Sequence, residues 1–141
     1  MAGEKISKIY CWKINSDKLS IYLASSGRGA VRVGLGLEEK SDCPEYFSII
    51  FPSNRIIEDK NMNRLLIKAV SSALKKGEVL HNLPLDISCT PFQLQVWKTI
   101  SKIPNGKTKT YGEIAFSINK AGGARAVGQA MKRNPLPLIF P

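Results

Sequence analysis

The spacing of apolar residues changes along this chain of 141 residues, and that change most limits its fold. Residues 6–14, 19–26 and 27–37 are rich in β-branched and aromatic residues with partial period-two alternation, which is typical of strands. From residue 63 onward, apolar residues recur at helical spacing. The order predicts a fold of the α/β class, more narrowly α+β, in which an antiparallel sheet precedes helices.

The first part of the chain predicts a meander followed by one helix. Residues 15–18 (NSDK) favour a turn between the first two strands, and residues 63–76 place a run of Leu, Ala and Val on one helical face. Residues 83–88 (LPLDIS) indicate either a link or a fourth strand.

The second part predicts three helices. Thr90 and Pro91 are an N-cap and a first helical residue, so a helix begins there. Residues 111–119 and 124–134 predict two short helices separated by KAGG, a pattern typical of a helix-turn-helix. The last helix carries small residues at Ala124, Ala126, Gly128 and Ala130.

Those small residues allow two interpretations. They let a backbone approach the floor of a DNA minor groove, with Arg125 and Lys132 as its cationic side chains. They also allow close helix–helix packing, which composition alone favours.

Charge is concentrated in the same part of the chain. The formal net charge is +10, and residues 89–141 hold eight Lys and Arg against a single acid, Glu113. This distribution indicates either a polyanionic partner, such as nucleic acid or an anionic membrane, or simply a basic surface on a soluble protein.

Several classes of protein are disfavoured by composition. No apolar run approaches 18 residues, and the N-terminus lacks a secretory signal, so we expect no membrane association. Cys11, Cys43 and Cys89 form neither a zinc pattern nor a disulfide framework, which predicts a cytoplasmic protein without a metal or other cofactor.

Three segments in order resemble the O6-alkylguanine-DNA alkyltransferase family. They are PFQLQVWKTISKIPNGKTKTYGEIA (91–115), GARAVGQAM (123–131) and NPLPLIFP (134–141). The resemblance implies a ribonuclease-H-like N-terminal domain over residues 1–88 and a winged-helix-like DNA-binding domain over residues 89–141. It also implies repair of O6-alkylguanine by irreversible transfer of the alkyl group to a cysteine.

The resemblance further implies that a monomer binds double-stranded DNA through the minor groove, with the alkylated guanine flipped out of the duplex. Arg125 matches the residue that fills the vacated space, and Tyr111 matches the tyrosine that presses on the 3′ phosphate. The full set implied to bind DNA is Tyr111, Gly112, Ala124, Arg125, Ala126, Gly128 and Lys132. The alternatives are a core aromatic for Tyr111 and a phosphate-binding arginine for Arg125.

Asn134 matches the family's hinge asparagine, which braces the turn that carries the active site; its alternative is an ordinary Asn-Pro turn. In the family this segment runs directly into Cys-His-Arg-Val. We therefore expect a truncated and inactive chain whose acceptor, a cysteine or a selenocysteine encoded by UGA, would follow Pro141. We also expect the apolar run before Pro141 to be uncovered and the chain to fold poorly.

Two other functions stay open. A non-enzymatic, alkyltransferase-like protein would bind DNA lesions without accepting the alkyl group. A winged-helix transcription regulator fits less well, because the Ala- and Gly-rich helix lacks side chains that read bases. None of the three cysteines aligns with the family nucleophile, so we interpret them as packing residues.

Overall fold

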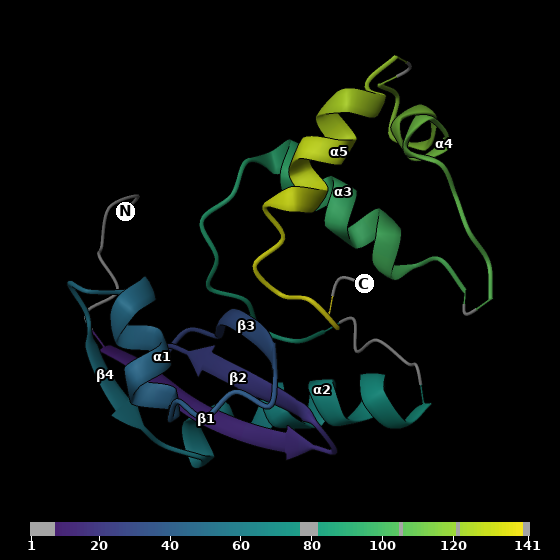
Figure 1. Ribbon diagram of the computed structural model, residues 1–141. Coiled ribbons are helices and arrows are strands. Elements are labelled where there is room, and N and C mark those ends of the chain that lie inside the picture. Colours follow the sequence, from purple (N-terminus) through teal and green to yellow (C-terminus); the bar gives the residue numbers. More distant parts are fainter. Residues whose placement is uncertain (1–7, 77–81, 105, 121, 140–141) are drawn as a thin grey trace.

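Four strands form one sheet in the computed structural model, which describes residues 8–76, 82–104, 106–120 and 122–139 (Figure 1). The sheet has the order β3-β2-β1-β4. The strands are β1 (Lys8–Ser16), β2 (Leu19–Ser25), β3 (Ala30–Leu37) and β4 (Arg55–Glu58).

The first three strands form the predicted antiparallel meander. The fourth strand was not predicted and runs parallel to β1, so the sheet is mixed and the expectation of a wholly antiparallel sheet was incomplete. Helix α1 (Cys43–Ile50) carries the chain from β3 to the far edge, and such a crossover is how two parallel strands become neighbours.

Alternation along β2 sends its side chains to two different cores. Tyr22 and Ala24 pack on one face with Cys43 and Phe47 of α1. Ile21 and Leu23 pack on the other face, against α2 (Arg64–Lys76), which follows the short 3-10 helix η1 (Asn61–Asn63). The sheet is therefore covered on both faces.

Three helices follow at the predicted places. They are α3 (Pro91–Ser101), α4 (Tyr111–Ser117) and α5 (Ala124–Lys132). Figure 1 shows them grouped to one side of the sheet. The expected α+β architecture is confirmed.

Two chain segments join the helices to the sheet, and both lie against β3. In the first, Ala30 N–H donates to Pro84 O at 2.9 Å and Asp86 N–H donates to Ala30 O at 2.8 Å. Residues 83–88 are thus a link with a single bridge to β3. The largest hydrophobic cluster continues across this link, from Leu23 to Trp97. The domain boundary between residues 88 and 89 stays a prediction.

The second segment is the apolar run near residue 139, and its expected exposure was wrong. Leu136 is 0% exposed and Ile139 is 2% exposed. Val33 N–H donates to Pro135 O at 2.8 Å, which fixes the run along β3 and lets these side chains join the main cluster. Pro141 itself lies outside the described residues.

Within the described ranges, none of the helices is long and apolar enough to cross a bilayer.

Candidate nucleic-acid interface

Helix α4 begins with a reciprocal cap that fixes the position of Tyr111. Thr110 Oγ1 accepts from Glu113 N–H at 3.1 Å, and Glu113 Oε1 accepts from Thr110 N–H at 3.3 Å. This capping box follows from the sequence TYGE, a signal that our sequence analysis did not use. It also engages the single acidic side chain of residues 89–141.

The turn between α4 and α5 requires glycine at one position. A Cβ on Gly123 would lie 2.8 Å from Lys120 O, too close for any other residue without a shift of the backbone. Gly123 is also the N-cap of α5, and it supplies no side chain to bond the first N–H groups of that helix. The positive end of α5 therefore has backbone donors for an anion.

Tyr111 and Gly128 lie against each other. A Cβ on Gly128 would be 3.3 Å from Tyr111 Cε2, so the tyrosine ring packs over the glycine and α4 approaches α5 closely. The ring remains 49% exposed, and the interpretation of Tyr111 as a core aromatic is therefore wrong. Close packing of the small helix is thus confirmed and positions an exposed tyrosine, whereas its approach to a minor groove stays a prediction.

The exposed face of α5 carries the cations. Arg125, Gly128 and Lys132 are spaced by three and four residues and share one helical face. Val127 and Ala130 form the opposite, buried face. Ala124 is partly buried beside the turn and Ala126 is exposed, so α5 has a low, positively charged outer surface.

Helix α5 packs against α3, and Trp97 of α3 makes a hydrogen bond to it. Trp97 is 1% exposed, and its Nε1–H donates to the Ala130 carbonyl oxygen at 2.8 Å. The Ala130 carbonyl also accepts from Arg133 N–H at 3.2 Å, so the indole is a second donor to a carbonyl in the last turn of α5. Trp97 therefore positions the helix that carries Arg125.

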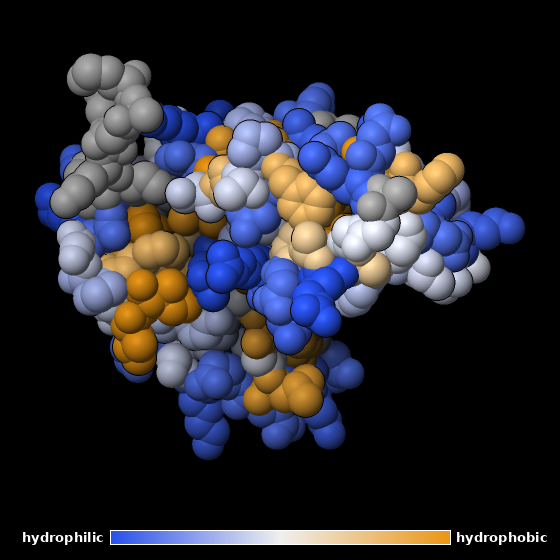
Figure 2. All heavy atoms as spheres, turned by 90° about the horizontal axis from the view of Figure 1, so that it is seen from above, coloured by the Kyte–Doolittle hydropathy of each residue, from blue (hydrophilic) through white to orange (hydrophobic). Residues whose placement is uncertain are grey.

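All eight cationic residues from residue 89 onward are exposed. Figure 2, seen from the side of α4 and α5 in Figure 1, shows hydrophilic and pale side chains interleaved with some hydrophobic ones. A basic surface with little side-chain bulk on α5 suits the phosphate backbone of a duplex.

The remaining predicted residues lie at the edges of this interface. Gly112 is exposed in the first turn of α4, where a Cβ would make only an ordinary contact at 3.8 Å with Thr110 Oγ1. Asn134 follows α5, and its Oδ1 accepts from Leu136 N–H at 2.9 Å. This bond braces the turn that leads the chain from α5 onto β3.

Two of the three cysteines belong to the core on the α1 side of the sheet, away from α5. Cys11 and Cys43 are buried on the α1 side of the sheet, with their Sγ atoms 2.8 Å apart. Burial raises the pKa of both thiols, and it also raises the pKa of Cys89, where Lys98 partly opposes the shift. A raised pKa makes the nucleophilic thiolate scarce at neutral pH. The described residues contain no cluster of three or more His, Cys, Asp or Glu able to hold a metal ion.

Comparison with known proteins gives a consistent result. The profile of the "6-O-methylguanine DNA methyltransferase, DNA binding domain" matches residues 91–141. The inducible methylated-DNA–protein-cysteine methyltransferase of Bacillus subtilis is 32% identical over 122 residues, which cover 86% of this chain and 68% of the relative. Regulatory protein ada of Salmonella typhimurium is 34% identical over 119 residues, covering 84% of this chain and 33% of the relative.

Solved structures agree with the sequence relatives. OGT of Mycobacterium tuberculosis in complex with DNA superposes with a TM-score of 0.67 at 28% identity. The superposition covers 95% of this chain and 74% of that protein. The O6-methylguanine methyltransferase of the same organism gives a TM-score of 0.66, with coverage of 94% and 75%.

Proposed function

The chain belongs to the methylated-DNA–protein-cysteine methyltransferase family, and from this premise we propose that it serves the direct repair of O6-alkylguanine in DNA. The observation that carries the proposal is the contact of Tyr111 with Gly128 on the exposed, cationic face of α4 and α5. This arrangement places an aromatic ring, an arginine and the N-terminal end of α5 together on an exposed surface.

We assign this surface to the minor groove of double-stranded DNA. Small residues on α5 let its backbone approach the groove floor, and the first N–H groups of the helix face a phosphate. Arg125 occupies the space left by the flipped guanine, and Tyr111 presses on the neighbouring 3′ phosphate. Gly112, Ala124, Ala126 and Lys132 complete the contact surface of a protein that acts as a monomer in the cytoplasm.

In this proposal the alkyl acceptor is none of the three cysteines of these 141 residues. The raised pKa values of Cys11, Cys43 and Cys89 support this assignment, because none of these thiols is activated.

Binding is tested by gel-shift competition between a duplex with one O6-methylguanine and the same duplex with guanine. We expect binding to both, with preference for the lesion because a poorly paired base costs less to flip. Equal affinity for the two duplexes would overturn the lesion-recognition part of the proposal.

Transfer is tested separately with a duplex that carries an isotopically labelled O6-methyl group. We expect no label on the 141-residue chain, and label on any of its three cysteines would contradict the acceptor assignment.

Recognition of lesions without transfer is the second candidate function. It is favoured by the same two observations, an intact interface and thiols whose pKa is raised. A full-length chain that binds the lesion duplex but acquires no label would select this candidate over repair.

A further inference from the structure

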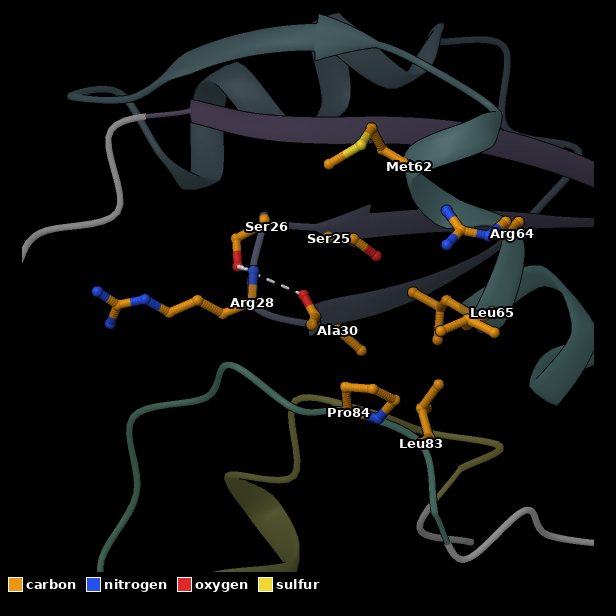
Figure 3. Close-up of a pocket in the computed structure, with 12 residues that line it drawn as sticks. Ser25, Ser26, Arg28, Ala30, Met62, Arg64, Leu65, Leu83 and Pro84 are labelled. Carbon is orange, nitrogen blue, oxygen red and sulfur yellow. Dashed lines mark hydrogen bonds between the residues drawn. The ribbon is translucent and has the colours of Figure 1, made fainter.

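A cavity of about 270 Å³ lies where the sheet, α2 and the link to α3 meet (Figure 3). Its walls come from the turn between β2 and β3, from the start of α2, and from Leu83 and Pro84. The residues that line it include none from α4 or α5, so it is separate from the proposed DNA interface.

The floor of the cavity carries a hydroxyl group that is open to the cavity. Ser25 is 4% exposed and lines the cavity, and its hydroxyl has no hydrogen-bond partner within the described part of the chain. The adjacent Ser26 differs, since its hydroxyl donates to Asp86 Oδ2 at 2.5 Å. The hydroxyl oxygen is open to the cavity rather than enclosed by protein, so it is available to donate a hydrogen bond to a ligand.

The charge of the lining favours an anion. Arg28 and Arg64 are its charged residues, and no acidic side chain lines it. Figure 3 shows the Arg64 guanidinium directed towards the Ser25 hydroxyl, while Arg28 extends outward from the rim. Arg64 Nη1 donates to Asn61 O at 3.2 Å, which holds the side chain in place and leaves other N–H groups of the guanidinium for a ligand.

The rest of the lining is apolar and partly exposed to solvent. Met62, Leu65, Leu83 and Pro84 surround the polar pair, and Leu65 is 47% exposed. A bare phosphate or sulfate would meet these side chains without a hydrogen bond, at a desolvation cost. A ligand with an apolar body covers them instead, and the cavity volume limits it to a small molecule.

We propose that this cavity binds a small carboxylate with a short apolar chain. Its carboxylate accepts hydrogen bonds from the Arg64 guanidinium and the Ser25 hydroxyl, and its carbon chain packs against Leu65 and Leu83. The planar fork of a guanidinium matches a carboxylate with two parallel hydrogen bonds, which selects this head group over a neutral amide.

The experiment is a titration of the ¹⁵N-labelled 141-residue chain with hexanoate, followed by the amide signals of Ser25–Ala30 and Arg64–Leu66. We expect saturable shifts confined to these residues. Hexanamide, which has the same shape without charge, and inorganic phosphate, which lacks the apolar body, are expected to bind at least tenfold more weakly. Equal binding of either probe, or no saturable shift with hexanoate, would overturn the proposal.

Three variants locate the site. Arg64→Gln and Ser25→Ala each remove one polar partner, and we expect about a tenfold loss of hexanoate affinity for the arginine variant and a smaller loss for the serine variant. Arg32→Gln, at an exposed position of β3 outside the lining, is the matched control and is expected to bind as the parent does. Unchanged affinity in a folded Arg64→Gln chain, judged by its amide spectrum, would refute the proposed contact.

Discussion

The sheet region, residues 8–76, and the helical region, residues 90–132, differ in how much of each element they bury. In β2 every residue from Ser20 to Ser25 is buried, because α1 covers one face of the sheet and α2 covers the other. In α4 only Ile114 and Ala115 are buried, and in α5 only Val127 and Ala130 are. The outer faces of α4 and α5 thus stay exposed, whereas β2 is enclosed on both sides.

The largest expected effect is the loss of stability when a buried aromatic is removed, and two variants distinguish this loss from an effect on DNA binding. Trp97→Ala and Phe47→Ala each remove a buried aromatic, and each should lower the free energy of unfolding by about 3–5 kcal/mol in urea titrations. Trp97 also holds α5 through Ala130 O, so only its variant should lose duplex affinity beyond the fraction that unfolds. Equal affinity per folded molecule in the two variants would contradict the positioning role of Trp97.

The next largest effect is on duplex affinity, and it compares an exposed arginine of α5 with one of β3. Arg125→Ala should weaken binding to an O6-methylguanine duplex about tenfold or more, because a charged contact contributes about 1.5–3 kcal/mol. Arg32→Ala, the same change on an exposed position of β3, should leave affinity within a factor of two or so of the parent. Gel-shift titration at fixed salt measures both, and equal losses would show that net charge alone determines binding.

The buried thiols make the sheet region sensitive to alkaline pH. The pKa values of Cys11 and Cys43 are raised above 9.0 by burial, so the unfolded chain releases these protons first as pH rises. Their contribution to stability is complete below about pH 8 and is lost above pH 9, by up to about 1.4 kcal/mol per pH unit for each thiol.

Urea titrations from pH 7 to 10 test whether the free energy of unfolding falls as the pH rises. Cys43→Ala should have a shallower alkaline loss than the parent, since one thiol has been removed. A parent chain whose stability rises from pH 8 to pH 10 would contradict the assignment.

The smallest effect compares two capping boxes. Thr110→Ala and Thr90→Ala should each lower the free energy of unfolding by about 1 kcal/mol, because each removes an N-cap acceptor. Only Thr110→Ala should also reduce duplex affinity, since its helix begins with Tyr111. Glu113→Gln preserves the reciprocal bond and is the conservative control.

The sequence predicted the parts of the fold that depend on local signals. Three strands followed from period-two alternation, and α3 followed from Thr90 and Pro91. Helix α1 and strand β4 were missed because they are short: eight residues and four residues give too few repeats to establish a period.

The interface was predicted by resemblance more than by physical pattern. Small residues in α5 allow close packing and close approach to DNA equally. The contact between Tyr111 and Gly128 confirms the packing, and the approach to DNA stays a prediction. Burial of Leu136 and Ile139 depends on a turn at Asn134 and on docking along β3, which no local pattern encodes. The cavity near Ser25 likewise joins segments about 40 and 60 residues apart, so no sequence spacing indicates it.

Strand β3 receives both connections between the two regions within four residues, at Ala30 and Val33. The Ala30 and Val33 amides donate to the link and to the segment after α5, so each is protected from exchange with solvent only while that segment stays docked. Amide hydrogen exchange at these two positions therefore reports movement of the helices against the sheet, independently of global unfolding. If both amides exchange together, the helices move as one body; if Val33 alone exchanges early, the segment beginning at Asn134 is released first.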